Sequence, residues 1–275
     1  MRDTDCVAFL QWALPSLDLR WHGFRKVHGQ VCKRLKRRIK ALGLEDITAY
    51  RKRLEVDPDE WAVLDDMCHI TISRFFRDSH IFEALAVHVL PEIAKRAAQE
   101  KREARFWAAG CASGEEPYTL KIVWDLEVSS AHSDVGCLII ATDVDRAMLD
   151  RARKSCYPRG SLRELPETFR QAFDEFADLY CVKEKHRKGV HILEQDLRWE
   201  APEGLFDLVL CRNVAFTYFE HPLQKQVLHR LVKHLSPSGY LVIGADERLP
   251  EDVDGLIPLP GAPEVFFLRN GQMSS

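Results

Sequence analysis

Between residues 104 and 244, short apolar segments alternate with segments of helical periodicity. The apolar segments have the length of buried strands and lie at residues 104–109, 137–142, 190–193, 206–211 and 240–244. The intervening segments have helical patterns at residues 115–127, 146–155 and 222–235. This alternation predicts an α/β fold with a doubly wound, mostly parallel sheet and helices on both faces. A last strand, 265–268, is expected at a sheet edge. Ligands in such sheets bind beyond the carboxyl ends of the strands.

The first 90 residues have a different pattern, which predicts a small all-α domain. Apolar residues recur there at spacings of three and four, as on one face of a helix. They are Phe24, Val27, Val31, Leu35, Ile39 and Leu42. A highly charged stretch at 94–105 is expected to link the domains. The prediction is therefore a helical domain at 1–90 and a catalytic domain at 91–275.

Positive charge is concentrated in the helical domain. From Arg20 to Arg53 there are twelve Lys and Arg residues against Glu45 and Asp46, although the whole chain has a net charge of −3. Such an asymmetry indicates an acidic partner for this region, and a solvated helix face remains the alternative. Nucleic acid is disfavoured as the partner, because aromatic residues are not interleaved with the charges and the chain is acidic overall.

The eight cysteines are scattered and form no CxxC pair. Several lie in apolar stretches, so buried reduced thiols are expected rather than disulfides or a metal site. No apolar run reaches the roughly 20 residues that a membrane helix needs. The first residues lack the pattern of a signal peptide, so a cytoplasmic location is expected.

The first predicted strand leads into a glycine-containing turn at Gly110 and Gly114. Glycines allow a tight turn and a close approach of ligand to backbone. Ser113 and Glu116 have the spacing of a capping box. The dinucleotide fingerprint GxGxxG is absent, and two glutamates at the helix start make a poor site for a pyrophosphate. The turn instead suits a cationic sulfonium ligand.

Carboxylates follow the next two predicted strands. Asp143 stands directly at the end of its strand, where it is placed to accept hydrogen bonds from two ribose hydroxyls. Asp196 follows the next strand and can accept from an adenine amino group. Each acid alone can also be a helix cap or a solvated loop residue, but successive strand ends with these groups predict an adenosyl pocket.

Several motifs in order resemble one family. They are Cys32–Leu44 (CKRLKRRIKALGL), Ser73–Asp78 (SRFFRD), Ala109–Tyr118 (AGCASGEEPY), Ala141–Asp145 (ATDVD) and Leu210–Val214 (LCRNV). With these motifs the chain resembles the CheR-type methyltransferases, which use S-adenosylmethionine to methylate glutamates on bacterial chemotaxis receptors. The resemblance covers roughly residues 31–247. It implies a Rossmann-like class I methyltransferase domain, with S-adenosyl-L-homocysteine as the product.

The resemblance also implies roles for particular residues. Thr71, Ser73 and Arg77 would approach the cofactor or the reacting carboxylate, and Tyr218 would match the family's active-site tyrosine. The cofactor pocket would be lined by Glu116, Asp143, Asp196, Leu197, Arg212 and Asn213, together with the turn at Gly110 and Gly114. The basic helix Lys33 to Lys40 would lie against an acidic helix of the receptor.

The chain departs from the family pattern in three places. Five residues, Ala215–Phe219, follow the Arg-Asn-Val motif where four are usual. The usual His-Ser-Glu is Ala245-Asp246-Glu247. A small β subdomain that docks a receptor tail in some members would fall near residues 179–193, with short loops.

Methyl transfer to a glutamate requires little acid–base catalysis by the enzyme. A glutamate carboxylate, with a reference pKa of about 4.3, is ionised at neutral pH and needs no general base. Arg77 can hold one carboxylate oxygen while the other attacks, and no metal is expected. Two alternatives remain: a methyltransferase of the same fold with another protein or small-molecule acceptor, and a non-catalytic module that senses S-adenosylmethionine.

Overall fold

The computed structural model describes residues 2–250 and 255–269. The chain forms two compact units, Met1–Ile70 with Thr217–Gln224, and Thr71–Phe216 with Lys225–Ser275. The boundary thus lies at residue 70 rather than near 90. The reason is hydrophobic burial: Phe75, Phe82 and Leu90 belong to the core of the second unit.

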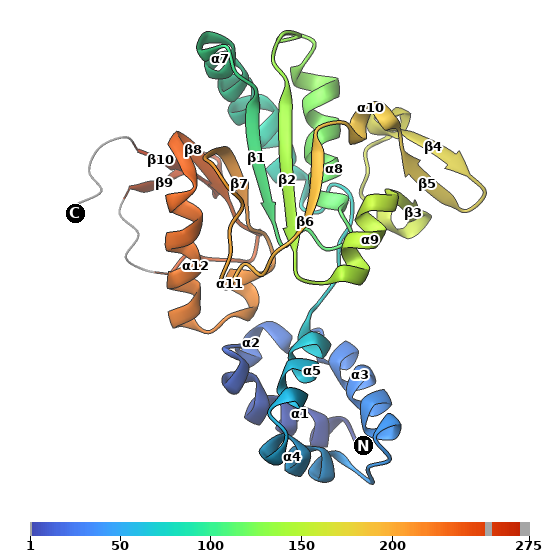
Figure 1. Cartoon of the computed structure of the whole chain (residues 1–275). Helices are drawn as coiled ribbons and strands as arrows, with labels where there is room; N and C mark the ends of the chain where they lie inside the picture. Colours follow the sequence, from blue (N-terminus) through green and yellow to red (C-terminus); the bar gives the residue numbers. More distant parts are fainter. Residues whose placement is uncertain (1, 251–254, 270–275) are drawn as a thin grey trace. The chain divides into compact units, whose positions relative to one another are not determined.

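The first unit is helical, as expected (Figure 1). Its helices are α1 (Asp3–Ala13), α2 (Trp21–Phe24), α3 (His28–Ala41), α4 (Ile47–Val56) and α5 (Asp59–Cys68), with a 3₁₀ turn at Leu14–Leu17. The basic helix α3 is amphipathic, because Val31, Leu35 and Ile39 recur on one face and are buried. Two further helices, α11 (Ala215–Tyr218) and α12 (His221–Lys233), supply the residues that join this unit from the later part of the chain.

The second unit is built on a seven-stranded sheet of order β6-β2-β1-β7-β8-β10-β9. Its strands are β1 (Ala104–Ala109), β2 (Cys137–Asp143), β6 (Val190–Glu194), β7 (Phe206–Leu210), β8 (Leu235–Val242), β9 (Leu256–Leu259) and β10 (Ala262–Leu268). The first five in this list pair in parallel, and β10 is antiparallel to β8 and β9. The predicted mostly parallel sheet is therefore confirmed. β10 lies inside the sheet rather than at its edge, because β9 covers it.

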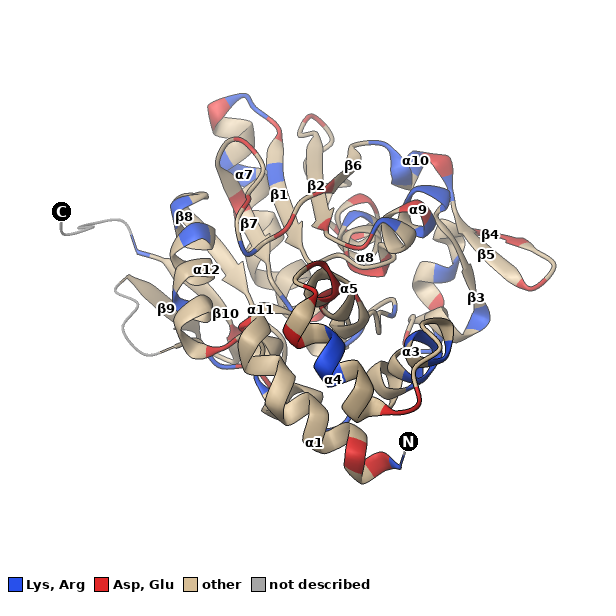
Figure 2. Ribbon diagram, turned by 60° about the horizontal axis from the view of Figure 1, so that its bottom comes forward, with Lys and Arg blue, Asp and Glu red and all other residues tan. Residues whose placement is uncertain are grey.

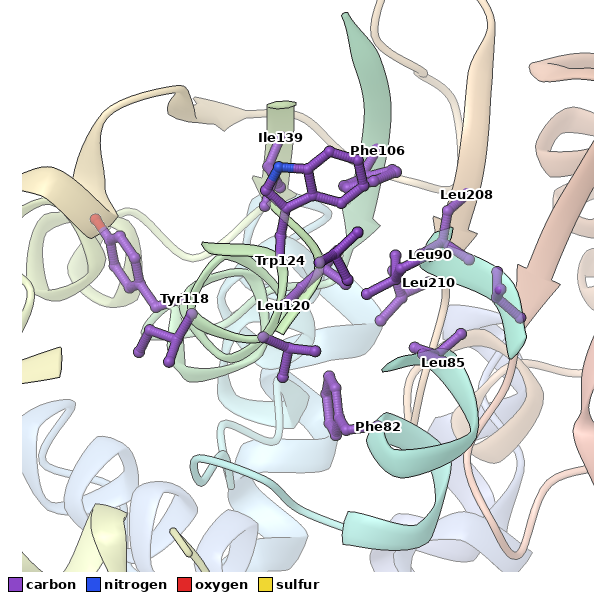
Figure 3. Packing of buried hydrophobic residues seen from close by; sticks show 14 of the residues in the cluster. Phe82, Leu85, Leu90, Phe106, Tyr118, Leu120, Trp124, Ile139, Leu208 and Leu210 are labelled. Carbon is purple, nitrogen blue, oxygen red and sulfur yellow. The ribbon is translucent and has the colours of Figure 1, made fainter. Parts of the chain in front are cut away.

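Helices pack on the sheet through side chains that alternate along the strands. They include α6 (Ser79–Ala84), α7 (Leu90–Glu100), α8 (Glu115–Val123) and α9 (Arg146–Lys154), and short π-helical turns follow α6 and α8. Figure 3 shows Phe106 and Ile139 of the sheet beside Leu120 and Trp124, with the rings of Phe106 and Trp124 edge to face at 5.4 Å. On the opposite side of β1, the ring of Trp107 contacts His234 directly after α12. Both faces of the sheet are thus covered.

A small antiparallel sheet of order β3-β5-β4 accompanies the large one. Its strands are β3 (Cys156–Pro158), β4 (Phe173–Phe176) and β5 (Leu179–Val182), and the four-residue helix α10 (Glu184–Arg187) leads from it to β6. The small sheet thus occupies residues 156–182, whereas the expected span was 179–193. Residues 190–193 of the expected span belong instead to β6, which pairs with β2 in the large sheet.

The expectation that all cysteines are reduced is wrong for two pairs. Cys6 is bonded to Cys32, and Cys156 to Cys181. The second pair follows from strand register, because β3 and β5 place Cys156 directly opposite Cys181. Periodicity along the chain does not reveal such pairings, because 26 and 25 residues separate the partners. Cys68, Cys111, Cys137 and Cys211 are free thiols. Throughout the described residues, no helix combines the length and the apolar character needed to cross a membrane.

Candidate functional site

Five parallel strands end at the same edge of the large sheet, and the predicted pocket residues follow these ends. The turn after β1 is bonded to β2, since the N–H groups of Gly110 and Cys111 both donate to the carbonyl oxygen of Thr142 over 2.8 and 2.9 Å. The N–H of Gln195, after β6, donates to the carbonyl oxygen of Asp143 over 3.0 Å. The turn, Asp143 and Gln195 are therefore one bonded assembly within the second unit.

The turn needs its glycines for two reasons. Gly110 and Gly114 have φ angles of +79° and +90°, which residues with a Cβ rarely adopt. A Cβ on Gly110 would also lie 2.5 Å from a methyl carbon of Val214. The expected capping box is wrong, because Gly114 itself is the N-cap of α8. The Ser113 hydroxyl donates instead to the buried Glu115 carboxylate over 2.8 Å.

Asp143 is held in place by main-chain donors. One carboxylate oxygen accepts from the N–H of Ala112 over 2.7 Å, and the other from the N–H of Asp145 over 2.9 Å. A carboxylate oxygen can accept more than one hydrogen bond, so this side chain is a candidate for binding ribose hydroxyls. The side-chain oxygen of Gln195, whose main chain is bonded to Asp143, is buried and has no hydrogen-bond partner. A buried acceptor of this kind fits an adenosyl ligand, which brings hydroxyl and amino donors.

Asp196 and Leu197 also follow β6, but Asp196 is already paired. Its carboxylate accepts from Arg198, with a shortest contact of 2.8 Å. The adenine acceptor suggested by the sequence is thus partly occupied by a neighbour in the same loop. Gln195 is the residue that sequence reasoning passed over, and its place one residue earlier at the strand end was the available signal. Leu197 is buried, and its carbonyl oxygen accepts from Arg230 over 3.0 Å.

Arg212 is the centre of a buried cluster of charges. Its guanidinium donates to Glu116 over 2.7 Å, to Asp78 over 2.8 Å and to the carbonyl oxygen of Arg77 over 2.7 Å. Burial raises the pKa of Glu116 above its usual value, and the charge of Arg212 opposes that rise. Arg212 lies just after β7. Its hydrogen bonds therefore connect the end of β7 to the start of α8 and to the turn at Arg77.

The turn that carries Arg77 has an unusual backbone. Phe76 and Asp78 have φ angles of +55° and +58°, a region that costs energy for residues with a Cβ. The Phe76 N–H is held by the hydroxyl oxygen of Thr119 over 3.2 Å. The Arg77 side chain donates to the carbonyl oxygen of Ile72 over 3.1 Å rather than pairing with Asp78. Thr71 and Ser73 are half-buried in the segment just before this turn.

Asn213 is fixed by a residue to which the sequence assigned no role. Its N–H donates to a carboxylate oxygen of Glu247 over 2.9 Å, and the N–H of Gly244 donates to the same oxygen over 2.7 Å. Glu247 is 8% exposed. Within the departure Ala245-Asp246-Glu247, the glutamate therefore keeps a structural role, because it joins the ends of β7 and β8.

Tyr218 does not belong to the same compact unit as these residues. It lies with residues 1–70, whereas Arg77 and all ten predicted cofactor residues lie in the second unit. Its ring meets the buried ring of Phe24 edge to face, with the centroids 5.1 Å apart. The two predicted catalytic residues therefore come from different units.

Two buried thiols lie next to predicted cofactor residues in the chain. Burial raises the pKa values of Cys111 and Cys211 well above the usual range, and Asp143 adds to the effect at Cys111. Neither is a thiolate nucleophile at neutral pH. No group of three or more His, Cys, Asp or Glu side chains that could hold a metal ion occurs in residues 2–250 and 255–269.

The basic helix α3 divides into an exposed and an internal set of charges. Figure 2 shows Lys and Arg gathered along α3. The exposed set, called here the basic face, is Lys33, Lys36, Arg37 and Lys40. Arg34 instead donates to the carbonyl oxygen of Met67 over 2.9 Å, and Arg38 pairs with the buried Glu60 at 2.6 Å. Those two arginines fasten α5 to α3 within the helical unit.

Comparison with known proteins agrees with this geometry. A model of the family described as CheR methyltransferase, SAM binding domain, matches residues 71–262. A chemotaxis protein methyltransferase of Listeria monocytogenes is 35% identical over 67% of this chain and 68% of its own length. A probable chemotaxis protein methyltransferase of Rhizobium etli is 31% identical over 80% and 84%, and one from Salmonella typhimurium is 30% identical over 79% and 75%. The chain belongs to the CheR methyltransferase family and is an S-adenosylmethionine-dependent methyltransferase.

Proposed function

We propose that this enzyme transfers a methyl group from S-adenosylmethionine to glutamate side chains of a chemoreceptor, with Arg77 and Tyr218 as its catalytic residues. The observation that carries the proposal is the assembly at the carboxyl ends of the strands, in a chain with the family's motifs. Asp143 is bonded there to the glycine turn, and Glu116 is bonded to Arg212. The proposed location of the reaction is the cytoplasm.

The cofactor, when bound, supplies an electrophilic methyl group on a sulfonium centre. Asp143 would accept hydrogen bonds from the ribose hydroxyls, and Gln195 and Asp196 would take donors of the adenine or ribose. Glu116, at the start of α8, would place negative charge near the cationic ligand. These residues bind and orient, because a glutamate acceptor is already ionised at neutral pH and its attack requires no proton transfer.

Arg77 would hold the acceptor carboxylate. A guanidinium binds one or both oxygens of a carboxylate in a planar geometry that a lysine cannot reproduce. Its present partner is a single main-chain carbonyl at 3.1 Å, which a carboxylate with full charge can replace. The Tyr218 hydroxyl would donate a second hydrogen bond that fixes the direction of attack.

The partner would be an acidic helix that meets the basic face of α3. Lys33, Lys36, Arg37 and Lys40 are exposed and carry like charge along about two turns of α3. Complementary charge of this type mainly speeds association. The internal position of Arg34 and Arg38 reduces the proposed contact set from the six charges of the sequence to four.

The test is methylation of a purified cytoplasmic chemoreceptor fragment with S-adenosylmethionine labelled in its methyl group. We expect label that is released as methanol by mild base, the behaviour of a carboxyl methyl ester, and no label on a panel of small metabolites. Transfer to a metabolite instead would establish the alternative acceptor. Cofactor binding without any transfer would favour a sensing module.

Variants of Arg77 test the catalytic assignment in the same assay. Arg77→Ala should lower kcat by about 10²-fold or more, the scale seen when a positioning group is lost, with cofactor affinity retained. Arg77→Lys should restore only part of the activity. Arg74→Ala is the matched control, because Arg74 lies in the same segment and is ion-paired with Glu164 at 3.3 Å. Wild-type turnover by Arg77→Ala would remove this residue from the mechanism.

A further inference from the structure

A segment of the helical unit that contains none of the family motifs pairs with the chain around Tyr218. Residues 18–20 run antiparallel to residues 218–220. The N–H of Arg20 donates to the carbonyl oxygen of Tyr218 over 2.8 Å. The N–H of Glu220 donates to the carbonyl oxygen of Asp18 over 2.7 Å. The main chain of Tyr218 is thus held in a short sheet-like pairing.

The Arg20 side chain adds a third bond. Its Nε–H donates to the carbonyl oxygen of Thr217 over 3.1 Å. One residue therefore binds two successive carbonyl groups, those of Thr217 and Tyr218. Both residues belong to α11.

The ring of Tyr218 is confined from the same segment. Phe24 is fully buried and meets the tyrosine ring edge to face at 5.1 Å. The preceding Gly23 lies so close that a Cβ there would be 2.3 Å from the Thr217 carbonyl oxygen and 3.0 Å from the Tyr218 ring. Since the nearer atom is backbone, a side chain at Gly23 would require a main-chain shift at residue 23 or at residues 217–218.

We propose that Arg20, Gly23 and Phe24 are positioning residues that set the place of Tyr218 and thereby the rate of methyl transfer. The proposal rests on the catalytic role of Tyr218 in the proposed function. It also explains how the enzyme tolerates the extra residue after Arg-Asn-Val. The register of Tyr218 is set by its pairing with residues 18–20, which lie 197 residues away in sequence at the Arg20–Thr217 bond.

Gly23→Ala is the most direct test, with Gly29→Ala as its matched control. Gly29 is in α3 and has no atom within 4 Å of where a Cβ would stand. With saturating S-adenosylmethionine and the chemoreceptor fragment, we expect Gly23→Ala to lower kcat by roughly 10- to 100-fold, the effect of a displacement of about 1 Å. The KM for S-adenosylmethionine should stay within about twofold, because the cofactor residues lie in the other unit. Gly29→Ala should match the wild type.

Two additions separate positioning from general damage. Arg20→Ala removes the side-chain bond to Thr217 but keeps the main-chain pairing, so it should fold and still lower kcat. In a Tyr218→Phe background, Gly23→Ala should have little further effect on kcat, because residues that act through one group are not additive. Full additivity would mean that Gly23 acts elsewhere.

A direct readout of the ring does not depend on methyl transfer. The protein has six tyrosines, so the ¹⁹F resonance of Tyr218 in fluorotyrosine-labelled protein can be assigned by its loss in Tyr218→Phe. We expect this resonance to move in Gly23→Ala and Phe24→Leu, and to stay in place in Gly29→Ala. If Tyr218→Phe keeps full kcat, the catalytic role in the proposed function is wrong. If Gly23→Ala and Arg20→Ala leave both kcat and the resonance unchanged, the positioning inference is overturned.

Discussion

Single carboxylates carry most of the proposed cofactor recognition. Asp143 and Glu116 lie at the same sheet edge but differ in what surrounds them. Main-chain N–H groups of Ala112 and Asp145 hold the Asp143 carboxylate. Burial dominates at Glu116 and opposes its charge, although Arg212 lies within 2.7 Å. Substitution of Glu116 should therefore have an effect that depends on pH.

Asp143→Ala should weaken the binding of S-adenosyl-L-homocysteine by about 1.5–3 kcal/mol, the range for hydrogen bonds to a charged group. Calorimetry of binding measures this directly. Asp145→Asn is the control from the same loop, because Asp145 caps α9 through the N–H of Met148 and asparagine also caps well. Equal affinity in Asp143→Ala and the wild type would place the ribose contact elsewhere.

Glu116→Gln should change how stability depends on pH. The raised pKa of Glu116 means that the folded protein binds this proton more tightly than the unfolded chain. The contribution of Glu116 to the free energy of unfolding is therefore greatest below its usual pKa of 4.5 and is lost as pH rises through the raised value. Since glutamine cannot ionise, the stability of the variant relative to the wild type should increase with pH across this window.

Urea unfolding of both proteins at several pH values between about 4 and 7.5 gives the comparison. The quantity to compare is the difference in the free energy of unfolding between the variant and the wild type, because the other carboxyl groups contribute equally to both proteins. A difference that is constant with pH would show that burial does not raise the pKa of Glu116.

At the scale of elements, α3 separates internal from surface charge. Lys36→Glu with Arg37→Glu reverses two charges of the basic face and leaves the bonds of Arg34 and Arg38 intact. We expect a higher apparent KM for the chemoreceptor fragment, unchanged cofactor affinity and a weaker dependence on salt. The reason is that screening shortens from about 30 Å at 0.01 M to about 8 Å at physiological ionic strength.

The control for α3 is an equal charge change on another exposed helix. Arg151→Glu with Lys154→Glu on α9 alters net charge by the same amount in the second unit. If both double variants raise KM alike, the effect comes from net charge and the basic face is not the docking surface. Arg34→Glu is unsuitable for this test, because it would remove the donor to the carbonyl at the end of α5.

For the whole molecule, the division into two units predicts which elements a bound cofactor should stabilise. All the predicted cofactor residues lie in the second unit. At 100 times its Kd, a ligand stabilises the folded state that binds it by about 2.7 kcal/mol. Hydrogen exchange with and without S-adenosyl-L-homocysteine should therefore show added protection in β1, β2, β6 and α8, and far less in α1, α4 and α5. Equal added protection in both units would mean that they unfold as one.

The sequence by itself determined the architecture of the second unit, and it suggested candidate positions for the site. Alternating strands and helices allow few arrangements, and parallel strands bring their carboxyl ends to one edge. Asp143 and Asp196 were therefore predicted as candidates from the strand ends, whereas Arg212 was predicted from the family resemblance. The helical character of the first unit was equally clear, because amphipathic spacing is a local property.

Tertiary structure alone decided which groups are paired. The sequence does not separate Arg34 and Arg38 from the four exposed charges of α3, and it does not join Cys156 to Cys181. It places the domain boundary too late, and it offers no sign that residues 18–24 hold Tyr218. The physical reason is the same in each case: a pairing depends on how distant segments meet, and the composition around each partner is compatible with several partners or with none.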